Sequence, residues 1–506
     1  MTRYQAAARS LAWVCLESGG VSLLSFLTVL VLARLLGPTE FGTAAIALGI
    51  VQILFLVPET FFHDAVVQRK EVGPDVLDSA LTASVLAGAV LAGLCWLLGP
   101  AAERLFSAPG LAAVLGWSGL SLLAGGLGGI PMAVLRRRLE FRHLALRSLS
   151  GRVVGAAVGL AMAFGGYGVW ALVGQQLAGS AVAALAIWAV PPWRPRLRLS
   201  PAALRGLVPF AVPAFTAALL AHANLRGLVL LTGYVLGPDG AGVLAVALRL
   251  VDTARQIMGA ALQQLALPLF SRCRDDRAAL ARGFAGATEM TALVAVPLFA
   301  GLAALAPAMV AVALGPHWEA AVPLVRVLAL AAILLLAQQH AGTVLTAVGA
   351  PHRLALLNAA GLALLAALLL AFGAAGPLAA TLAWLARTAA TVPAGAWMLR
   401  RQAGIGWADQ VRPLAGPAAA AAVMAAVLVQ LPPDPDPLAA LLVQVPLGAV
   451  LYAASLAVLD RGALVRLARF LGAMAARPQD ASSPRAGRQA PAPAAPGPAC
   501  LPSYPP

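Results

Sequence analysis

The sequence predicts an all-α, polytopic membrane protein with about fourteen transmembrane helices, and three observations support this fold class. The first is composition: 61% of the 506 residues are hydrophobic and 11% are charged, whereas soluble domains have roughly 45–50% apolar and about 25% charged residues. The second is a series of long apolar segments along the chain. The third is an internal repeat that begins at a recurring turn. With a mean hydropathy of +0.86, the chain is not expected to form soluble domains.

The apolar segments define the predicted helices, because about 20 apolar residues are needed to cross ~30 Å of hydrocarbon. We expect spans at about 10–36, 42–63, 77–99, 110–133, 148–165, 168–190, 207–236, 241–270, 284–314, 320–348, 354–374, 376–399, 414–432 and 438–459. No connection between them is long enough for a soluble domain. The remaining residues, 461–506, begin as a basic stretch and become rich in Pro, Ala and Ser. They are predicted to form a cytoplasmic tail that is disordered towards its end.

Arginine determines the predicted orientation of the helices. The chain has 35 basic and 20 acidic residues, a formal net charge of +15, and Lys70 is its only lysine. Alternate connections carry arginine clusters, whereas Arg104 is the only basic residue in the other set. By the positive-inside rule, the arginine-rich connections and both termini are cytoplasmic. Topology therefore accounts for most of the positive charge, and no nucleic-acid partner is expected.

The cysteines and the N-terminus exclude several kinds of protein. Cysteine occurs at four positions, which are Cys15, Cys95, Cys273 and Cys500. Their spacing fits neither a zinc site nor a disulfide framework, so we expect no metal and no cofactor. The first apolar run follows Arg3 and Arg9 without a small-residue cleavage site, which predicts a retained first helix rather than a signal peptide.

The repeated turn divides the chain into two similar halves. The segment 36–42 (LGPTEFG) returns as 236–242 (LGPDGAG), and the match continues without a gap to Val51 and Val251. Six predicted spans lie between the copies, so both halves face the same way across the membrane. A parallel repeat predicts two six-helix lobes, over 1–200 and 201–405, followed by two further helices over 406–460. In transporters built from repeats, the substrate lies at the repeat interface near the bilayer midplane.

Four segments resemble a known family. They are 32–42 (LARLLGPTEFG), 65–69 (AVVQR), 131–141 (PMAVLRRRLEF) and 166–173 (GYGVWALV). Together they resemble the polysaccharide-export branch of the multidrug/oligosaccharidyl-lipid/polysaccharide (MOP) transporter superfamily, which includes the Wzx-type lipopolysaccharide and exopolysaccharide flippases. The resemblance covers about residues 5–460 and is strongest in the first 190.

This resemblance implies a location, a substrate and a mechanism. The location is the bacterial inner membrane. The substrate is an undecaprenyl-diphosphate-linked oligosaccharide, such as an O-antigen or exopolysaccharide repeat unit. The mechanism is flipping to the outer leaflet by alternating access between two six-helix lobes. The expected partners are this lipid-linked oligosaccharide, membrane lipids and other polysaccharide assembly proteins.

Arginines inside the spans are the leading candidates for a substrate site, because charged groups are costly within a bilayer and mark functional sites. Arginine stays ionised and binds phosphate oxygens through paired donors, which suits the diphosphate of a lipid carrier. We therefore expect a set of basic residues to contact the substrate, namely Arg226, Arg249, Arg255, Arg387, Arg34 and His222.

Helical spacing brings several of these residues together. Arg249 and Asp252 share one stripe of the eighth span with two glutamines, and Arg255 lies beside it. His222 and Arg226 are four residues apart and share a face of the seventh span. A short turn joins the two spans, so they are expected to be neighbours. The alternative for Arg249 and Asp252, and for Arg226 and Arg255, is an interhelical ion pair that only fixes helix packing. The alternative for Arg34, near the outer end of its helix, is snorkelling to the membrane surface.

Acidic groups in or near the spans are candidates for binding a coupling proton or sodium ion. They are Asp252, Asp64, Glu17 and Glu289. No catalytic residue is expected, and the chain is not predicted to be an enzyme. A polytopic glycan polymerase or glycosyltransferase usually needs a substantial outer loop, and every outer connection here is short.

Two further alternatives remain open. One is a small-molecule or multidrug antiporter of the same superfamily, for which a cavity dominated by acidic residues is expected. The other is a membrane scaffold without transport activity, and the arginines inside the spans argue against it.

Overall fold

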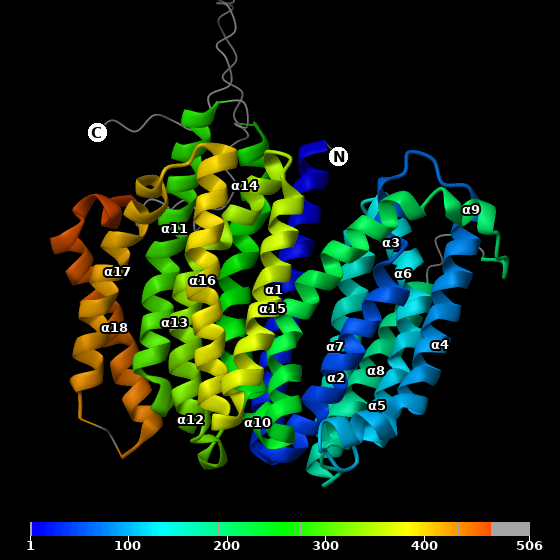
Figure 1. Cartoon of the computed structure of the whole chain (residues 1–506), viewed down its shortest axis with the longest axis horizontal. Helices are drawn as coiled ribbons and strands as arrows, with labels where there is room; N and C mark the ends of the chain where they lie inside the picture. The colour runs from blue at the N-terminus through cyan, green and yellow to red at the C-terminus, as the bar shows by residue number, and fades with distance from the viewer. Residues whose placement is uncertain (1–2, 190–192, 194, 273–275, 433–434, 467–506) are drawn as a thin grey trace, which may run out of the picture. The chain divides into compact units, whose positions relative to one another are not determined.

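The computed structural model describes residues 3–189, 193, 195–272, 276–432 and 435–466, without the side chains of 3–18, 257–272, 337 and 351 (Figure 1). In this part of the chain every regular element is a helix, which confirms the all-α prediction. The first nine helices are α1 (Arg3–Leu35), α2 (Pro38–Thr60), α3 (His63–Gln68), α4 (Pro74–Leu105), α5 (Leu111–Gly119), α6 (Ser121–Arg137), α7 (Phe141–Phe164), α8 (Trp170–Trp188) and α9 (Pro201–Arg205). The remaining helices are α10 (Val208–Arg272), α11 (Arg277–Ala304), α12 (Ala306–Ala313), α13 (Ala321–Gln339), α14 (Ala341–Ala347), α15 (Pro351–Phe372), α16 (Pro377–Ala403), α17 (Trp407–Gln430) and α18 (Pro437–Leu459), with short 3₁₀ turns at Pro316–Trp318 and Gly373–Ala375.

The chain is a multi-pass membrane protein. Eleven helical stretches in the described residues are long and apolar enough to cross a membrane. This count differs from about fourteen at three places. α10 is counted once, although the non-helical backbone at Gly237 divides it between the two predicted spans. The described side chains of α1 begin only at Gly19, and α16 is made less apolar by Arg387 and its threonines. The number of fourteen therefore stays a prediction.

The described residues form two compact units. Unit 1 contains those in 1–260, 306–328 and 355–388, and unit 2 contains those in 261–305, 329–354 and 389–466. α10, α13, α15 and α16 each contribute to both units. The predicted lobes and their boundary at residue 200 stay a prediction.

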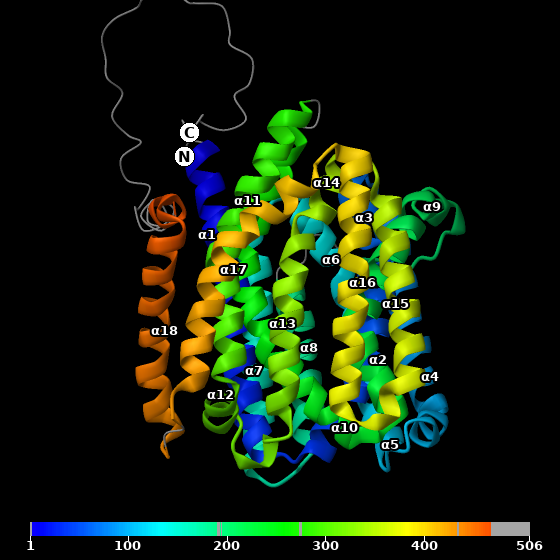
Figure 2. The same cartoon turned by 60° about the vertical axis from the view of Figure 1, so that its left-hand side comes forward.

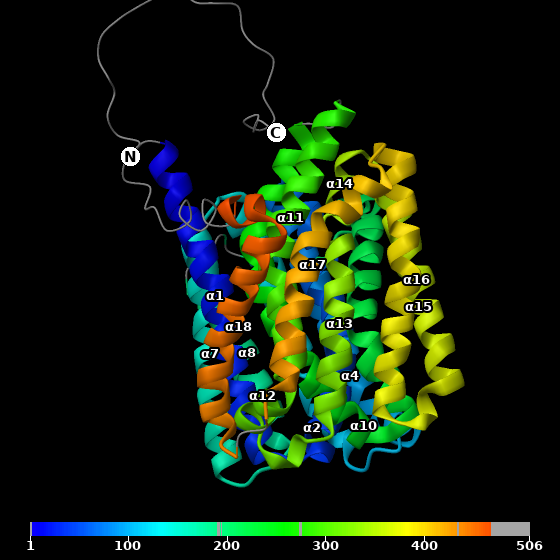
Figure 3. The ribbon, with the colours of Figure 1, turned by 90° about the vertical axis from the view of Figure 1, so that its left-hand side faces the viewer.

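In unit 1, both neighbouring helices of the chain and helices far apart in it pack against each other. α7 packs along α8, and α4 packs on α5 and α6. α1 lies beside α7, as Figure 3 shows. The core contains buried apolar side chains from several helices, including Ile46, Leu111, Leu122 and Val173. A second cluster joins α3, α4 and α6 to Leu207 and Ala211 at the start of α10.

The two copies of the repeated turn contact each other within unit 1. α2 begins at Pro38, and the second part of α10 begins at Pro238. A Cβ atom on Gly42 would overlap the carbonyl oxygen of Pro238, and one on Gly242 would overlap that of Pro38. The contact is reciprocal, as in interfaces with a two-fold axis. Only glycine permits this approach of the two backbones, which explains its recurrence at both positions.

The turns differ in the backbone of their first glycine. Gly37 has φ −76° and ψ 166°, which is ordinary extended backbone. Gly237 has φ 71° and ψ −167°, a region that essentially only glycine adopts. This conformation bends α10 between the two predicted spans. Beyond the bend, the Thr39 hydroxyl donates a hydrogen bond to the carboxylate of Asp239, its equivalent in the second copy.

Unit 2 is built around α11, α17 and α18. α17 packs against both α11 and α18, as Figure 2 shows. The Tyr452 hydroxyl donates a hydrogen bond to the Leu293 carbonyl at 3.0 Å, which joins α18 to α11. A separate apolar cluster joins the start of α11 to α14 and the end of α16.

Candidate functional site

The bend in α10 brings charged residues of its two parts together in unit 1. Arg226 lies 11 residues before Gly237 and Arg249 lies 12 residues after it, which corresponds to roughly 16–18 Å along each part. Both arginines are therefore near the middle of a ~30 Å hydrocarbon layer. Asp252 interacts electrostatically with both of them.

A third arginine joins this group from α7. Arg152 and Arg226 are the like charges that act on Arg249, and Asp252 is the opposite charge. The Nε atoms of Arg226 and Arg249 are buried and have no hydrogen-bond partner among the described residues. We call Arg152, Arg226, Arg249 and Asp252 the arginine group. The group contains three guanidinium groups and one carboxylate, and Asp252 acts on Arg226 and Arg249, so its composition favours an anionic ligand.

Arg255 lies six residues beyond Arg249, about one turn beyond Asp252, and pairs with the carboxylate of Asp252. Its Nε and Nη2 atoms are 3.2 Å and 3.1 Å from Oδ1 of Asp252. The pair is within one helix and Arg255 is exposed. In this structure the carboxylate of Asp252 is therefore paired with an arginine side chain.

A second charged cluster links α2, α6, α7 and α10. Nη2 of Arg147 is 3.4 Å from Oε1 of Glu59, and both side chains are largely buried. Arg136 and His222 also interact electrostatically with Glu59. His222 and Arg226 share a face of α10, so this cluster continues into the arginine group.

Glu59 and Arg147 were missed in the sequence. Glu59 is a carboxylate inside the predicted span 42–63, which was the signal for it. Arg147 lies one residue before the predicted span 148–165, so the sequence placed it in the connection between two spans. Asp64, a predicted ion-coupling residue, lies on α3, where its Oδ1 atom is 2.8 Å from Nδ1 of His63.

The structure places Arg387 away from the arginine group. It is 7% exposed, and its Nη2 donates a hydrogen bond to Oδ1 of Asn224 at 2.7 Å. Its guanidinium lies over the Trp384 ring, 4.7 Å from the centroid. Asn224 is two residues from both His222 and Arg226, so it points to the other side of α10, at roughly 200°. Arg387 thus joins α16 to α10.

The remaining predicted residues lie elsewhere. Arg34 donates hydrogen bonds to the carbonyls of Val312 and Ala313, the last of α12, which have no partner within their helix. In unit 2, Glu289 accepts from Arg466 at 2.5 Å and 3.0 Å. The side chain of Glu17 lies outside the described residues. The described residues hold no cluster of three or more His, Cys, Asp or Glu suited to a metal.

The sequence is similar to a family model and to three named proteins. The model, described as Polysaccharide biosynthesis protein, matches residues 31–323. The chain is 27% identical to the succinoglycan biosynthesis transport protein ExoT of Rhizobium meliloti, over 64% of this chain and 65% of that protein. It is 22% identical to the teichuronic acid biosynthesis protein TuaB of Bacillus subtilis, over 67% and 70%. It is 21% identical to the lipopolysaccharide biosynthesis protein WzxC of Escherichia coli, over 64% and 66%. The matched region thus spans about two thirds of each relative.

Two solved structures have a similar fold at low sequence identity. The lipid II flippase MurJ in an inward closed conformation gives a TM-score of 0.74 at 14% identity, covering 88% of this chain and 98% of that chain. A multidrug resistance MATE family transporter of the MOP superfamily, in an inward-facing conformation, gives 0.61 at 13% identity, covering 77% and 98%. The helices therefore have a fold of the MOP transporter type.

Proposed function

We propose that this chain, which belongs to the polysaccharide biosynthesis protein family, flips an undecaprenyl-diphosphate-linked oligosaccharide to the outer leaflet of the bacterial inner membrane. Membership confirms the resemblance to the polysaccharide-export branch that its motifs carry. The chain is thus a member of a transporter family of polysaccharide biosynthesis. The lipid-linked substrate, the direction of movement and alternating access belong to our proposal.

The arginine group carries the proposal. Guanidinium groups stay charged in a membrane and bind phosphate oxygens through two parallel N–H donors. Arg226 and Arg249 have buried donors available, and Asp252 neutralises only part of the positive charge. A diphosphate supplies the missing negative charge at mid-membrane depth, while its lipid tail remains in the bilayer. A multidrug antiporter for cations is expected to have the opposite balance of charge.

Alternating access requires the contact between the repeated turns to open. Gly42 and Gly242 hold the two turns in backbone contact at one end of unit 1. The arginine group lies about half a membrane thickness from this contact. We propose that an anion bound at the arginine group moves to the outer leaflet when the turns separate.

The test is complementation of a deletion strain of the native host. The variants are Arg226→Gln/Arg249→Gln and, as a control outside the arginine group, Arg104→Gln at the far end of α4. We expect the deletion to accumulate undecaprenyl-linked oligosaccharide on the cytoplasmic side. The double variant, at a normal level in the membrane, should accumulate it too, whereas the control should restore export.

Two outcomes contradict different parts of the proposal. If the deletion leaves polysaccharide export and carrier lipids unchanged, the chain is not the flippase, and a small-molecule antiporter is the better assignment. If the deletion accumulates the glycolipid but the double variant complements fully, the chain is the flippase and its headgroup site lies elsewhere.

A further inference from the structure

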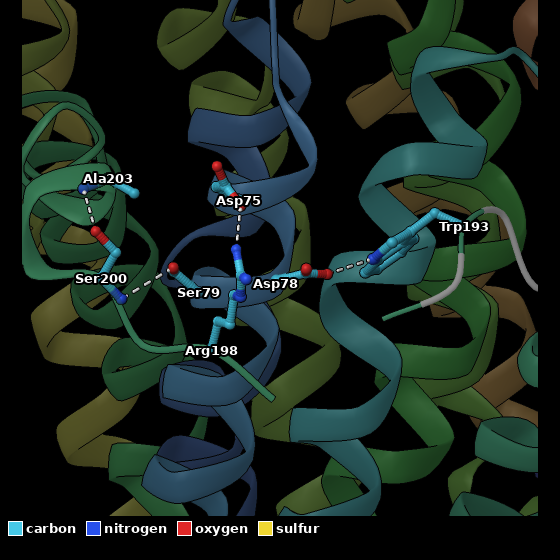
Figure 4. A network of polar contacts seen from close by, with 7 residues as sticks. All are labelled: Asp75, Asp78, Ser79, Trp193, Arg198, Ser200 and Ala203. Atoms are coloured by element: carbon cyan, nitrogen blue, oxygen red, sulfur yellow. Dashed lines mark hydrogen bonds and ion pairs between the residues drawn. The ribbon is translucent and has the colours of Figure 1, made fainter. Parts of the chain in front are cut away.

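The described residues 193 and 195–200, which precede α9, are held against the first turns of α4 (Figure 4). The Trp193 Nε1–H donates to Oδ1 of Asp78 at 2.9 Å, and the Ser200 backbone N–H donates to Oγ of Ser79 at 3.1 Å. Asp78 and Ser79 are both buried. The two hydrogen bonds fix the segment at both ends.

The chain after Ser200 is fixed as well. Oγ of Ser200 accepts a hydrogen bond from the Ala203 N–H at 3.4 Å, at the start of α9 (Figure 4). Leu207 and Ala211 are fully buried in the apolar cluster of α3, α4 and α6. Residues 193 and 195–211 are therefore docked on α3, α4 and α6, whereas Arg194 lies outside the described residues.

Between these attachment points the segment exposes apolar and basic side chains in alternation. Leu197 is 92% exposed and Leu199 is 53% exposed, and they alternate with Arg196 and Arg198. The Arg198 side chain makes a long, exposed ion pair with Asp75, at 3.4 Å (Figure 4). Exposing two leucines to water on a fixed backbone loses the free energy that their burial would provide.

The length of α4 places this segment in the headgroup layer. α4 has 32 residues and is thus roughly 48 Å long, whereas the hydrocarbon layer is ~30 Å and the bilayer with headgroups is ~40–45 Å thick. Its first turn, with Asp75, therefore lies among the headgroups when the apolar middle of α4 spans the hydrocarbon. The segment docked on this turn lies at the same depth.

The charge on this surface is positive. Its basic side chains are Arg69, Lys70, Arg196, Arg198 and Arg205. They outnumber its acidic side chains, Glu71 and Asp75. Arg69 belongs to the same surface, because its Nη1 is 3.1 Å from the position of a Cβ atom on Gly206. A lipid surface that attracts this group must be anionic.

We propose that residues 195–205 form an interfacial anchor that binds anionic phospholipids, with Leu197 and Leu199 inserted at the acyl boundary and Arg196, Arg198 and Arg205 on the headgroup phosphates. At this depth the apolar side chains can contact the acyl chains while the basic side chains contact the headgroups. The anchor holds this end of unit 1 at a fixed depth in the bilayer. The inference requires only a membrane-spanning chain, so it is independent of the transported substrate.

The first test is lipid binding by the full-length chain. The purified protein is titrated with phosphatidylglycerol and, separately, with phosphatidylcholine, and bound lipids are measured by native mass spectrometry. One arginine near an anionic surface contributes about fivefold in affinity. Arg196→Gln/Arg198→Gln should therefore weaken phosphatidylglycerol binding by about five- to thirtyfold, because Asp75 already neutralises part of Arg198. The control Arg104→Gln, at the other end of α4, should bind like the wild type.

The second test locates the leucines and does not depend on the arginine variants. Leu197→Cys, in the full chain with its native cysteines replaced by alanine, is labelled with bimane in vesicles of phosphatidylethanolamine and phosphatidylglycerol. We expect quenching by lipids with a nitroxide near the headgroup end of the acyl chain, and protection from iodide. Replacing phosphatidylglycerol with phosphatidylcholine should weaken the lipid quenching.

Three results would overturn the inference. Quenching by iodide would place Leu197 in water. Protection from both quenchers would mean that protein, such as a second copy of the chain, covers the segment. Lipid quenching that does not depend on phosphatidylglycerol, together with equal lipid binding by Arg196→Gln/Arg198→Gln and wild type, would exclude recognition of anionic headgroups.

Discussion

Arg387 and Arg226 are arginines of the same membrane protein, but their surroundings give them different roles. The partners of Arg387 are neutral: the Asn224 amide oxygen at 2.7 Å and the Trp384 ring. Arg226 shares the carboxylate of Asp252 with Arg249. All three arginines have a buried Nε without a hydrogen-bond partner among the described residues, so the difference lies in the neighbouring charges. Neutral partners favour a structural role for Arg387, whereas like charges beside one carboxylate favour an anionic ligand at Arg226 and Arg249.

We expect Arg387→Ala to destabilise the protein without abolishing transport by the folded molecules. The substitution leaves the buried Oδ1 of Asn224 without its donor, which costs about 1–3 kcal/mol. The thermal unfolding temperature in detergent should fall. Asn224→Ala should lower it at least as much, because it leaves both the Arg387 guanidinium and the Asn358 carbonyl without this partner. The double variant should be less destabilised than the sum of the two single variants, because they share one interaction. Loss of transport at an unchanged unfolding temperature would return Arg387 to the substrate site.

The sequence showed which charged residues lie within apolar segments, but it did not predict the residues with which they interact. Glu59 and Arg147 are 88 residues apart in the sequence. Asn224 also donates to the carbonyl of Asn358, which is 134 residues away. Helical spacing relates residues within one helix, as it did for His222 and Arg226. It says nothing of a partner on another helix, so the separate position of Arg387 was not predictable from the sequence.

At the scale of the helix, α10 depends on one residue for its bend. Gly237 adopts φ 71° and ψ −167°, while its equivalent in the first copy, Gly37, has φ −76° and ψ 166°. Neither position is crowded, since a Cβ atom would be 3.9 Å from its nearest neighbour at Gly237 and more than 4 Å away at Gly37. The two glycines therefore differ in backbone conformation, and both have room for a Cβ atom.

Alanine at these two positions should have unequal effects. Both residues precede the proline that starts a helix, so both substitutions carry the same cost of alanine at a helix N-cap. Gly237→Ala adds the strain of its backbone region, about 1–3 kcal/mol. We expect a lower unfolding temperature for Gly237→Ala than for Gly37→Ala in purified protein. Equal temperatures would show that α10 relaxes to an unstrained bend.

The helices themselves were predictable, and their interruptions were not. Each predicted apolar segment lies on a helix, because a run of about 20 apolar residues is a strong signal. The predicted span 110–133 is divided between α5 and α6 at Leu120, and the predicted span 284–314 is divided between α11 and α12 at Leu305. At Leu305 the backbone departs from the helical region, with φ −90° and ψ 10°, whereas Leu120 keeps helical values, φ −60° and ψ −22°. Hydrophobicity does not encode either interruption.

At the scale of the whole molecule, the repeat relates the arginine group to the contact between the turns. A gap-free match of the two turns predicted a duplication, and equivalent residues of the two copies meet in reciprocal contact. The arrangement of the complete lobes stays a prediction, because the repeat defines equivalence between segments but not how the helices pack. If the chain works by alternating access, this contact is the part of unit 1 that must open and close.

Cross-linking the two turns should therefore stop transport. Thr39 and Asp239 are hydrogen-bonded equivalents in the two copies, so Thr39→Cys/Asp239→Cys places two thiols in contact. We expect the oxidised double variant to accumulate glycolipid as a deletion does, and reduction to restore export, because the covalent bond prevents separation. Each single-cysteine variant, oxidised in the same way, controls for the lost hydrogen bond and for the oxidant. Complete cross-linking with undiminished export would mean that the turns never separate, and the path of the substrate would have to avoid this end of the protein.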